Sequence, residues 1–158
     1  MKLHDLLESS EGYAVADSFA LYQIATGHTS AASSVKSAVL AKDLHLVIPT
    51  VTFAVSCAMR TCWDEHCTKE HQFGTGSAVH SLFDRDGVEI LELSPDDAVS
   101  AGKLYARCAD QRIEGPEVLA ACHASHLARV RGAPLLSTSR AGYCYPAAVG
   151  HPGRIWLI

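Results

Sequence analysis

The chain has 158 residues, of which 48% are apolar and 19% are charged. This length suits one domain over residues 1–158, and the apolar content is enough to bury a core, which excludes a disordered chain. The formal net charge of −4 argues against a broad nucleic-acid-binding surface, although Arg129, Arg131 and Arg140 leave room for a local basic groove.

The N-terminal part of the chain predicts short buried strands that alternate with helices. The expected elements are a strand over 12–16, a helix over 19–25 that stops at Gly27, a helix from Thr29 or Ser30 to about residue 41, a strand over 46–49, and a helix over 50–60. The first strand leads directly into Asp17. The second strand ends at Pro49, which permits a helix to begin there.

The C-terminal part continues the alternation. Residues 62–84 are polar and helical in tendency, with an interruption at 74–76. The further elements expected are a strand over 88–93, a helix capped by Ser94 that runs to about residue 109, a helix from 115–117 to about residue 130, and strands over 133–137 and 154–158. Strands separated by helices predict an α/β fold with three α/β/α layers and a parallel sheet of about five strands. Function in such sheets lies at the carboxyl ends of the strands.

No apolar run is long enough to cross a bilayer, and no signal peptide is recognisable at the N-terminus. We therefore expect a cytoplasmic protein without a membrane segment. The six cysteines include no CxxC pair, so free thiols are expected rather than disulfides.

Four segments, in this order, carry a resemblance to a known family: residues 14–21 (AVADSFAL), 46–55 (LVIPTVTFAV), 117–124 (EVLAACHA) and 132–140 (GAPLLSTSR). Together they resemble the PIN domain, the fold of the VapC-type toxins of bacterial toxin–antitoxin pairs. The resemblance implies a ribonuclease fold in which a cluster of carboxylates holds Mg²⁺ or Mn²⁺. The metal would orient a water and stabilise charge on the cleaved phosphodiester.

The residues at the family's acid positions imply a degenerate site. Asp17 matches the first aspartate, Val55 stands where a glutamate is usual, Glu117 occupies the third acid position, and Ser139 the fourth. Asp17, Glu117 and Ser139 are thus the candidate catalytic remnant, and Asp17 and Glu117 the candidate ligands of a weakly held metal, if any. A carboxylate and a cation attract by about 4 kcal/mol at ~4 Å and an effective dielectric near 20, so losing one or two of four acids weakens binding heavily.

Each of these residues also has an ordinary structural interpretation. Asp17 precedes an apolar helix and suits a helix cap, while Glu117 suits the first turn of a helix because of the helix dipole. Ser139 fits an ordinary loop residue.

Cysteines and histidines four residues apart form a second constellation, namely Cys62 with His66, Cys67 with His71, and Cys122 with His126. Two such pairs that meet across helices or subunits could complete a tetrahedral zinc site. The alternative is a set of buried thiols and polar-face histidines. Two faces of one helix cannot serve one metal.

Two functions remain open at this point. The first is a non-catalytic PIN-like module that binds a protein or nucleic-acid partner. The alternative is a weak or atypical Mg²⁺-dependent endoribonuclease of the toxin–antitoxin type, acting on RNA. The resemblance also implies a homodimer and an antitoxin-like partner near the cleft, with residues 29–60 as the natural place for an interface.

Overall fold

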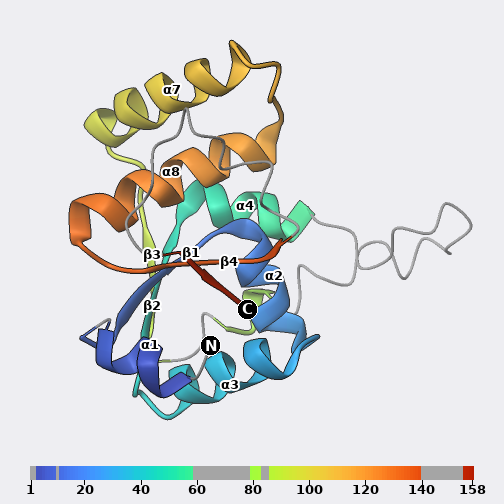
Figure 1. Cartoon of the computed structure of the whole chain (residues 1–158), viewed down its shortest axis with the longest axis vertical. Coiled ribbons are helices and arrows are strands. Elements are labelled where there is room, and N and C mark those ends of the chain that lie inside the picture. Colours follow the sequence, from blue (N-terminus) through green and yellow to red (C-terminus); the bar gives the residue numbers. More distant parts are fainter. Residues whose placement is uncertain (1–2, 10, 59–78, 83–85, 140–154) are drawn as a thin grey trace, which may run out of the picture.

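The computed structural model describes residues 3–9, 11–58, 79–82, 86–139 and 155–158. Its five strands form one sheet in the order β3-β2-β1-β4-β5, and every strand pairing is parallel (Figure 1). The strands are β1 (Tyr13–Ala16), β2 (His45–Pro49), β3 (Val88–Leu91), β4 (Leu135–Ser137) and β5 (Ile155–Leu157). The helices are α1 (Leu3–Ser9), α2 (Ser18–Thr26), α3 (Ser30–Leu40), α4 (Thr50–Ala58), α7 (Pro95–Ala109) and α8 (Pro116–Arg131).

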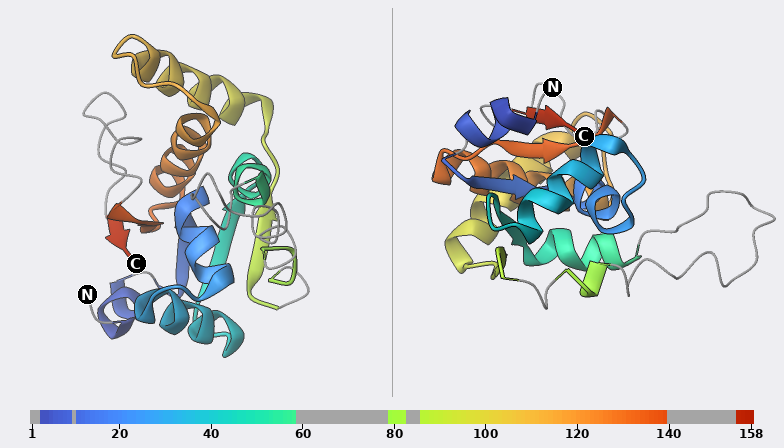
Figure 2. Two further views of the ribbon diagram at one scale, coloured as in Figure 1. Left: turned by 90° about the vertical axis from the view of Figure 1, so that its right-hand side faces the viewer. Right: turned by 90° about the horizontal axis from the view of Figure 1, so that it is seen from below.

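Helices cover both faces of the sheet. Ala14 and Ala16 pack into a cluster with α1, α2 and α3, whereas Val15, between them on β1, packs with Ala124 and Ala128 of α8. This division follows from the strand itself, because successive side chains point to opposite faces. Helix α7 packs on α8 and lies outside it, so α8 separates α7 from the sheet (Figures 1 and 2). The predicted three-layer α/β/α architecture with a five-stranded parallel sheet is confirmed.

Several predicted boundaries agree with local contacts. Ser94 caps α7 by accepting from the Asp97 N–H at 3.1 Å, and Thr29, rather than Ser30, caps α3 by accepting from the Ala32 N–H at 3.0 Å. Gly27 ends α2 in the left-handed conformation, with φ of 67°, which a residue without Cβ adopts readily.

Other boundaries were wrong. Strand β3 ends at Leu91 instead of residue 93, and β4 begins at Leu135 instead of residue 133. Helix α1 was not predicted, because seven residues are too few to establish a helical period and its place is decided by the burial of Leu6 in the core. The predicted interruption at 74–76 lies outside the described residues. Within the part of the chain that is described, no helix has the length and apolarity to span a bilayer.

Candidate functional site

The candidate site lies beside β1, where the order in which the chain adds strands to the sheet changes direction. From β1 the chain moves outward to β2 and β3, and it then returns to the other side of β1 with β4 and β5. Parallel α/β sheets bind their ligands beside the carboxyl ends of the strands at such a point. Asp17 directly follows β1, Ser137 is the last residue of β4, and the Asp17 N–H donates to the Leu136 carbonyl at 3.1 Å.

Asp17 is held on both of its carboxylate oxygens. The Ala20 N–H donates to Oδ1 at 2.7 Å, which makes Asp17 the N-cap of α2. The Ser137 hydroxyl donates to Oδ2 at 2.5 Å. The residue is 1% exposed. The helix-cap interpretation of Asp17 is therefore confirmed, and the same carboxylate also joins α2 to β4.

Small hydroxyl side chains lie at the start of α2 and on the elements that contact α2. The Ser56 hydroxyl, on α4, donates to the Ser18 carbonyl at 2.9 Å and so ties α4 to this point. The side-chain oxygens of Ser18, Thr52 and Thr138 are buried and have no hydrogen-bond partner among the described residues. Leaving a buried hydroxyl unpaired costs about 1–3 kcal/mol. Buried polar groups that reduce stability in this way are commonest at functional sites.

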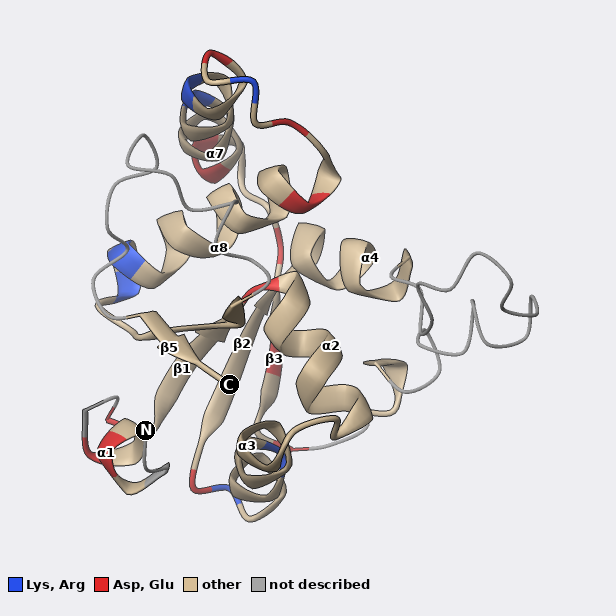
Figure 3. Cartoon of the chain, turned by 45° about the vertical axis from the view of Figure 1, so that its right-hand side comes forward, with Lys and Arg blue, Asp and Glu red and all other residues tan. Residues whose placement is uncertain are grey.

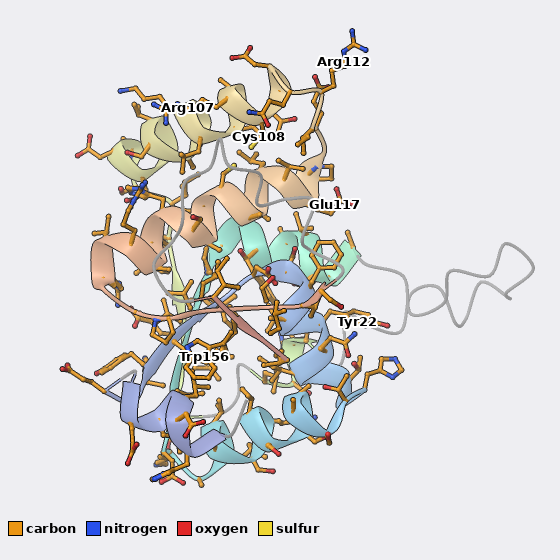
Figure 4. The ribbon with its side chains drawn as sticks, in the orientation of Figure 1. Tyr22, Arg107, Cys108, Arg112, Glu117 and Trp156 are labelled. Carbon is orange, nitrogen blue, oxygen red and sulfur yellow. The ribbon has the colours of Figure 1, made fainter. Side chains whose placement is uncertain are left out.

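Glu117 lies in the first turn of α8 and is labelled in Figure 4. Its Oε2 stands 2.8 Å from the position that a Cβ would take at Gly115, so the carboxylate folds back over the residue that precedes the helix. Gly115 has φ of 133° and gives no side-chain cap to α8. The negative carboxylate instead faces the positive end of the helix dipole.

The two remaining positions of the expected acid cluster carry no charge. Val55 is half-buried on α4 and offers no ligand atom, while Ser139 is exposed in the turn after β4. The structure therefore pairs Asp17 with Ser137 and not with Ser139. Figure 3, in which acidic residues are red, shows the sparse distribution of carboxylates over the ribbon.

The donors at this point do not fit a tightly held Mg²⁺ or Mn²⁺. Among the described residues, no group of three or more His, Cys, Asp and Glu side chains could hold a metal ion. The described side chains that donate to Asp17 or to the adjacent Ser18 carbonyl are the neutral hydroxyls of Ser137 and Ser56, whereas hard divalent cations favour several charged or strongly polar oxygens. The Asp17 carboxylate is also already engaged by two protein donors.

No family model matches the sequence, and no curated protein matches it either. Among solved structures, the chain is similar to the crystal structure of VapBC2 from Rickettsia felis bound to a DNA fragment from their promoter. The TM-score is 0.57 at 15% sequence identity, and the match covers 92% of this chain and 98% of that chain. The fold is PIN-like. At this level of identity the likeness concerns the fold alone.

The PIN-like fold presents a second polar region between α7 and α8. His126 Nε2 lies 2.9 Å from Asp97 Oδ1, and Cys122 Sγ lies 4.0 Å from Cys108 Sγ. The hydrogen bond from Ser94 and then the contact with His126 hold the pKa of the Asp97 carboxyl below its usual value. Cys122 and His126 were predicted to share one face of a helix, and both contact α7. Their partners there differ, because Cys122 contacts Cys108 and His126 contacts Asp97.

The other two cysteine–histidine pairs, Cys62 with His66 and Cys67 with His71, lie outside the described residues. Arg131 of the expected basic groove lies 3.7 Å from Glu89, measured from Nη1 to Oε2. Arg140 is also outside the described part of the chain.

His123 is a buried group that sequence reasoning did not single out. It lies on α8, is 0% exposed, and neither ring nitrogen has a hydrogen-bond partner in the described part of the chain. Burial lowers the pKa of His123, and the nearby Asp97 partly opposes this effect. The ring is therefore held in its neutral form within the fold at neutral pH.

The hydroxyls near Asp17 were also missed as a group. Residues 137–140 and those after Pro49 were expected at carboxyl ends of strands, where function was predicted, but no role was assigned to Ser137, Thr52 or Ser56. A signal for the latter existed: Thr52 and Ser56, four residues apart in a largely apolar helix, share one face. No comparable signal links Ser137 to Asp17, which lies 120 residues away in the chain.

Proposed function

We propose that this chain is a PIN-like domain, over residues 1–158, that binds a partner and does not cleave RNA efficiently. The observation that carries the proposal is the state of Asp17, whose two carboxylate oxygens both accept hydrogen bonds from the protein itself. A metal ligand at this position would have to share or surrender these contacts. Val55 and Ser139 add no negative charge that could offset the dehydration of a cation.

An antitoxin-like protein is the partner that we favour. The support is the likeness in fold to VapBC2, which covers 92% of this chain, and that structure also contains a DNA fragment from their promoter. We propose that the chain forms a homodimer and that its partner covers the carboxyl end of the sheet, near Asp17. The net charge of −4 favours a protein partner over direct and extensive contact with nucleic acid.

Cleavage of a mixed RNA substrate in Mg²⁺ or Mn²⁺ tests the catalytic half of the proposal. The wild type and Asp17→Asn should give the same background, because Asn retains an oxygen that can cap α2 but lacks the charge needed for a metal. The double variant Val55→Glu with Ser139→Asp should gain metal-dependent cleavage. Cleavage by the wild type that Asp17→Asn abolishes, at equal folded fraction, would contradict the proposal.

Co-expression with the product of a small gene immediately upstream, where one exists, tests the binding half. We expect a complex of defined stoichiometry in size-exclusion chromatography with light scattering, and a dimer of this chain within it. A chain that remains monomeric and fails to bind such a product would contradict this part.

The alternative is a weak Mg²⁺-dependent endoribonuclease with Asp17 and Glu117 as ligands and Ser139 as a neutral oxygen donor. One observation favours it: α2 and α8, which begin next to Asp17 and Glu117 respectively, contact each other and α4. Tight Mn²⁺ binding in a calorimetric titration, lost in Asp17→Ala, would support this alternative against the partner-binding proposal.

A further inference from the structure

Two cysteines from different helices meet in the interface between α7 and α8. Cys108 lies in the last turn of α7, and Cys122 lies near the middle of α8 (Figure 4 labels Cys108). Their sulfur atoms are 4.0 Å apart, and both residues are 0% exposed. The apolar side chains around them include Leu104, Val118 and Ala121.

A disulfide between these sulfurs requires only a local adjustment. Bonded sulfurs are about 2.05 Å apart, so the two atoms would have to approach each other by about 2 Å, which rotations of side chains and a small shift of α7 can supply. Helix α7 packs on α8 and lies outside it, so a small shift of α7 need not disturb the packing of the sheet (Figures 1 and 2).

We propose that Cys108 and Cys122 form a redox-responsive pair, which peroxide oxidises to a disulfide that fixes α7 to α8. One thiolate attacks an oxygen of hydrogen peroxide, the O–O bond breaks, and a sulfenic acid and one water result once the released hydroxide takes a proton. The second sulfur then attacks the sulfenic sulfur, the S–O bond breaks, and a second water leaves. Two thiols and one peroxide thus give one disulfide and two waters.

The closed interface protects the pair from this reaction. Both thiols are buried, and burial raises the pKa of the Cys108 thiol, which keeps it in its unreactive protonated form. Separation of α7 from α8 exposes a sulfur to peroxide, and closure then brings the second sulfur to the sulfenic acid. The disulfide therefore forms only after the interface between α7 and α8 has opened. This inference uses none of the residues of the Asp17 site and is independent of the proposed function.

Peptide mapping of the full chain after treatment with hydrogen peroxide tests the proposal directly. Trypsin cleaves after Arg107, Arg112 and Arg129, so Cys108 falls in peptide 108–112 and Cys122 in peptide 113–129, each with a single cysteine. We expect these two peptides to be joined, with the loss of two hydrogen atoms, and to separate after reduction. Joining of peptide 108–112 to the other cysteine peptides in comparable yield would overturn the proposal.

Thermal unfolding gives a second measurement. A disulfide that closes a loop of this length should raise the midpoint of the oxidised wild type by about 6–12 °C over the reduced protein. Cys57→Ala, which removes a different partly buried thiol, should retain this reductant-dependent shift, whereas Cys108→Ala and Cys122→Ala should lose it. If either single variant does not fold, the joined peptides of the wild type decide alone. If peroxide oxidises Cys108 and Cys122 to sulfinic or sulfonic acid and no joined peptides form, the proposal is also overturned.

Discussion

Two aspartates in this molecule make nearly the same contact in two different settings. Asp17 accepts a hydrogen bond from the Ser137 hydroxyl at 2.5 Å, and Asp97 accepts one from the Ser94 hydroxyl at 2.5 Å. Ser94 is three residues from Asp97, whereas Ser137 is 120 residues from Asp17. Asp17 is 1% exposed, while the Asp97 side chain is 22% exposed. The first contact joins distant parts of the chain within the core, and the second only organises the beginning of one helix.

The same chemistry should therefore matter more at Asp17 than at Asp97. Replacing Asp17 removes a buried cap and leaves the Ser137 hydroxyl unpaired, and both losses occur away from water. At Asp97, water can replace part of what is lost. The predictions below test this contrast, from the largest expected effect to the smallest.

Asp17→Ala should lower the free energy of unfolding by about 2–4 kcal/mol, because it removes the α2 cap and the partner of Ser137 together. Asp97→Ala should cost about 1 kcal/mol, since its contacts with Ser94 and His126 are partly solvated. Urea unfolding followed by circular dichroism at pH 7.5 measures both. Equal costs for the two variants would show that burial and sequence separation do not distinguish these contacts.

The α7–α8 region should respond to pH through His123. The folded pKa of His123 lies below its ordinary value, so the unfolded chain takes up this proton first as the pH falls. Its contribution to stability is complete above the unfolded pKa, about 6.5, and decreases below it, by at most about 1.4 kcal/mol per pH unit for one proton. The folded pKa of Asp97 is also lowered, and its contribution is lost only nearer pH 4, as its carboxyl protonates.

Urea midpoints at pH 7.5 and pH 5.5 separate the contribution of His123, which changes between these values, from that of Asp97, which is lost nearer pH 4. The wild type should lose stability over this interval, and His123→Leu should reduce the loss. His4→Gln, which replaces an exposed histidine of α1, is the matched control and should leave the loss unchanged. Asp97 and His126 are the charged or titratable neighbours that act on His123. In Asp97→Asn no carboxylate opposes the lowering of the folded His123 pKa, so the loss should begin at the same pH but continue to a lower pH. The prediction fails if His123→Leu and His4→Gln retain the same loss.

Ser137→Ala should lower the free energy of unfolding by about 1–2 kcal/mol, because the Asp17 carboxylate loses one buried donor but keeps the Ala20 N–H. Ser139→Ala is the matched control two residues further along, and it should change stability very little because Ser139 is exposed. Urea unfolding of the two variants side by side is the measurement. A larger effect at Ser139 than at Ser137 would contradict the pairing of Asp17 with Ser137.

Glu117→Gln should have the smallest effect, a loss of about 0.3–1 kcal/mol in low salt that largely disappears in 1 M salt. Only the interaction of the carboxylate with the start of α8 is removed, and Gln preserves the side-chain length. Urea midpoints in the two salt conditions provide the test. A loss that persists in high salt would indicate a specific contact for Glu117 beyond the helix dipole.

Local patterns in the sequence predicted most of the elements in the described part of the chain. Ser94 followed by proline and two acids identified the start of α7, and the end of α2 followed from Gly27, because the signals for caps lie within a few residues of one another. Helix α1 was not predicted, because it is short and its position depends on the burial of Leu6. The end of β3 and the beginning of β4 were wrong by two residues each, since ladder partners and not local composition set the limits of a strand.

By itself, the sequence determined the alternation of strands and helices and hence the PIN-like layers, and it determined that Val55 and Ser139 bring no carboxylate to the site. Only the tertiary structure decided that both oxygens of Asp17 are already bound, one by α2 and the other by Ser137 of β4. Tertiary structure likewise decided that Cys108 and Cys122 meet. The physical reason is that caps and periodicity depend on neighbours along the chain. The partners of a buried carboxylate or thiol depend instead on which strands and helices pack together.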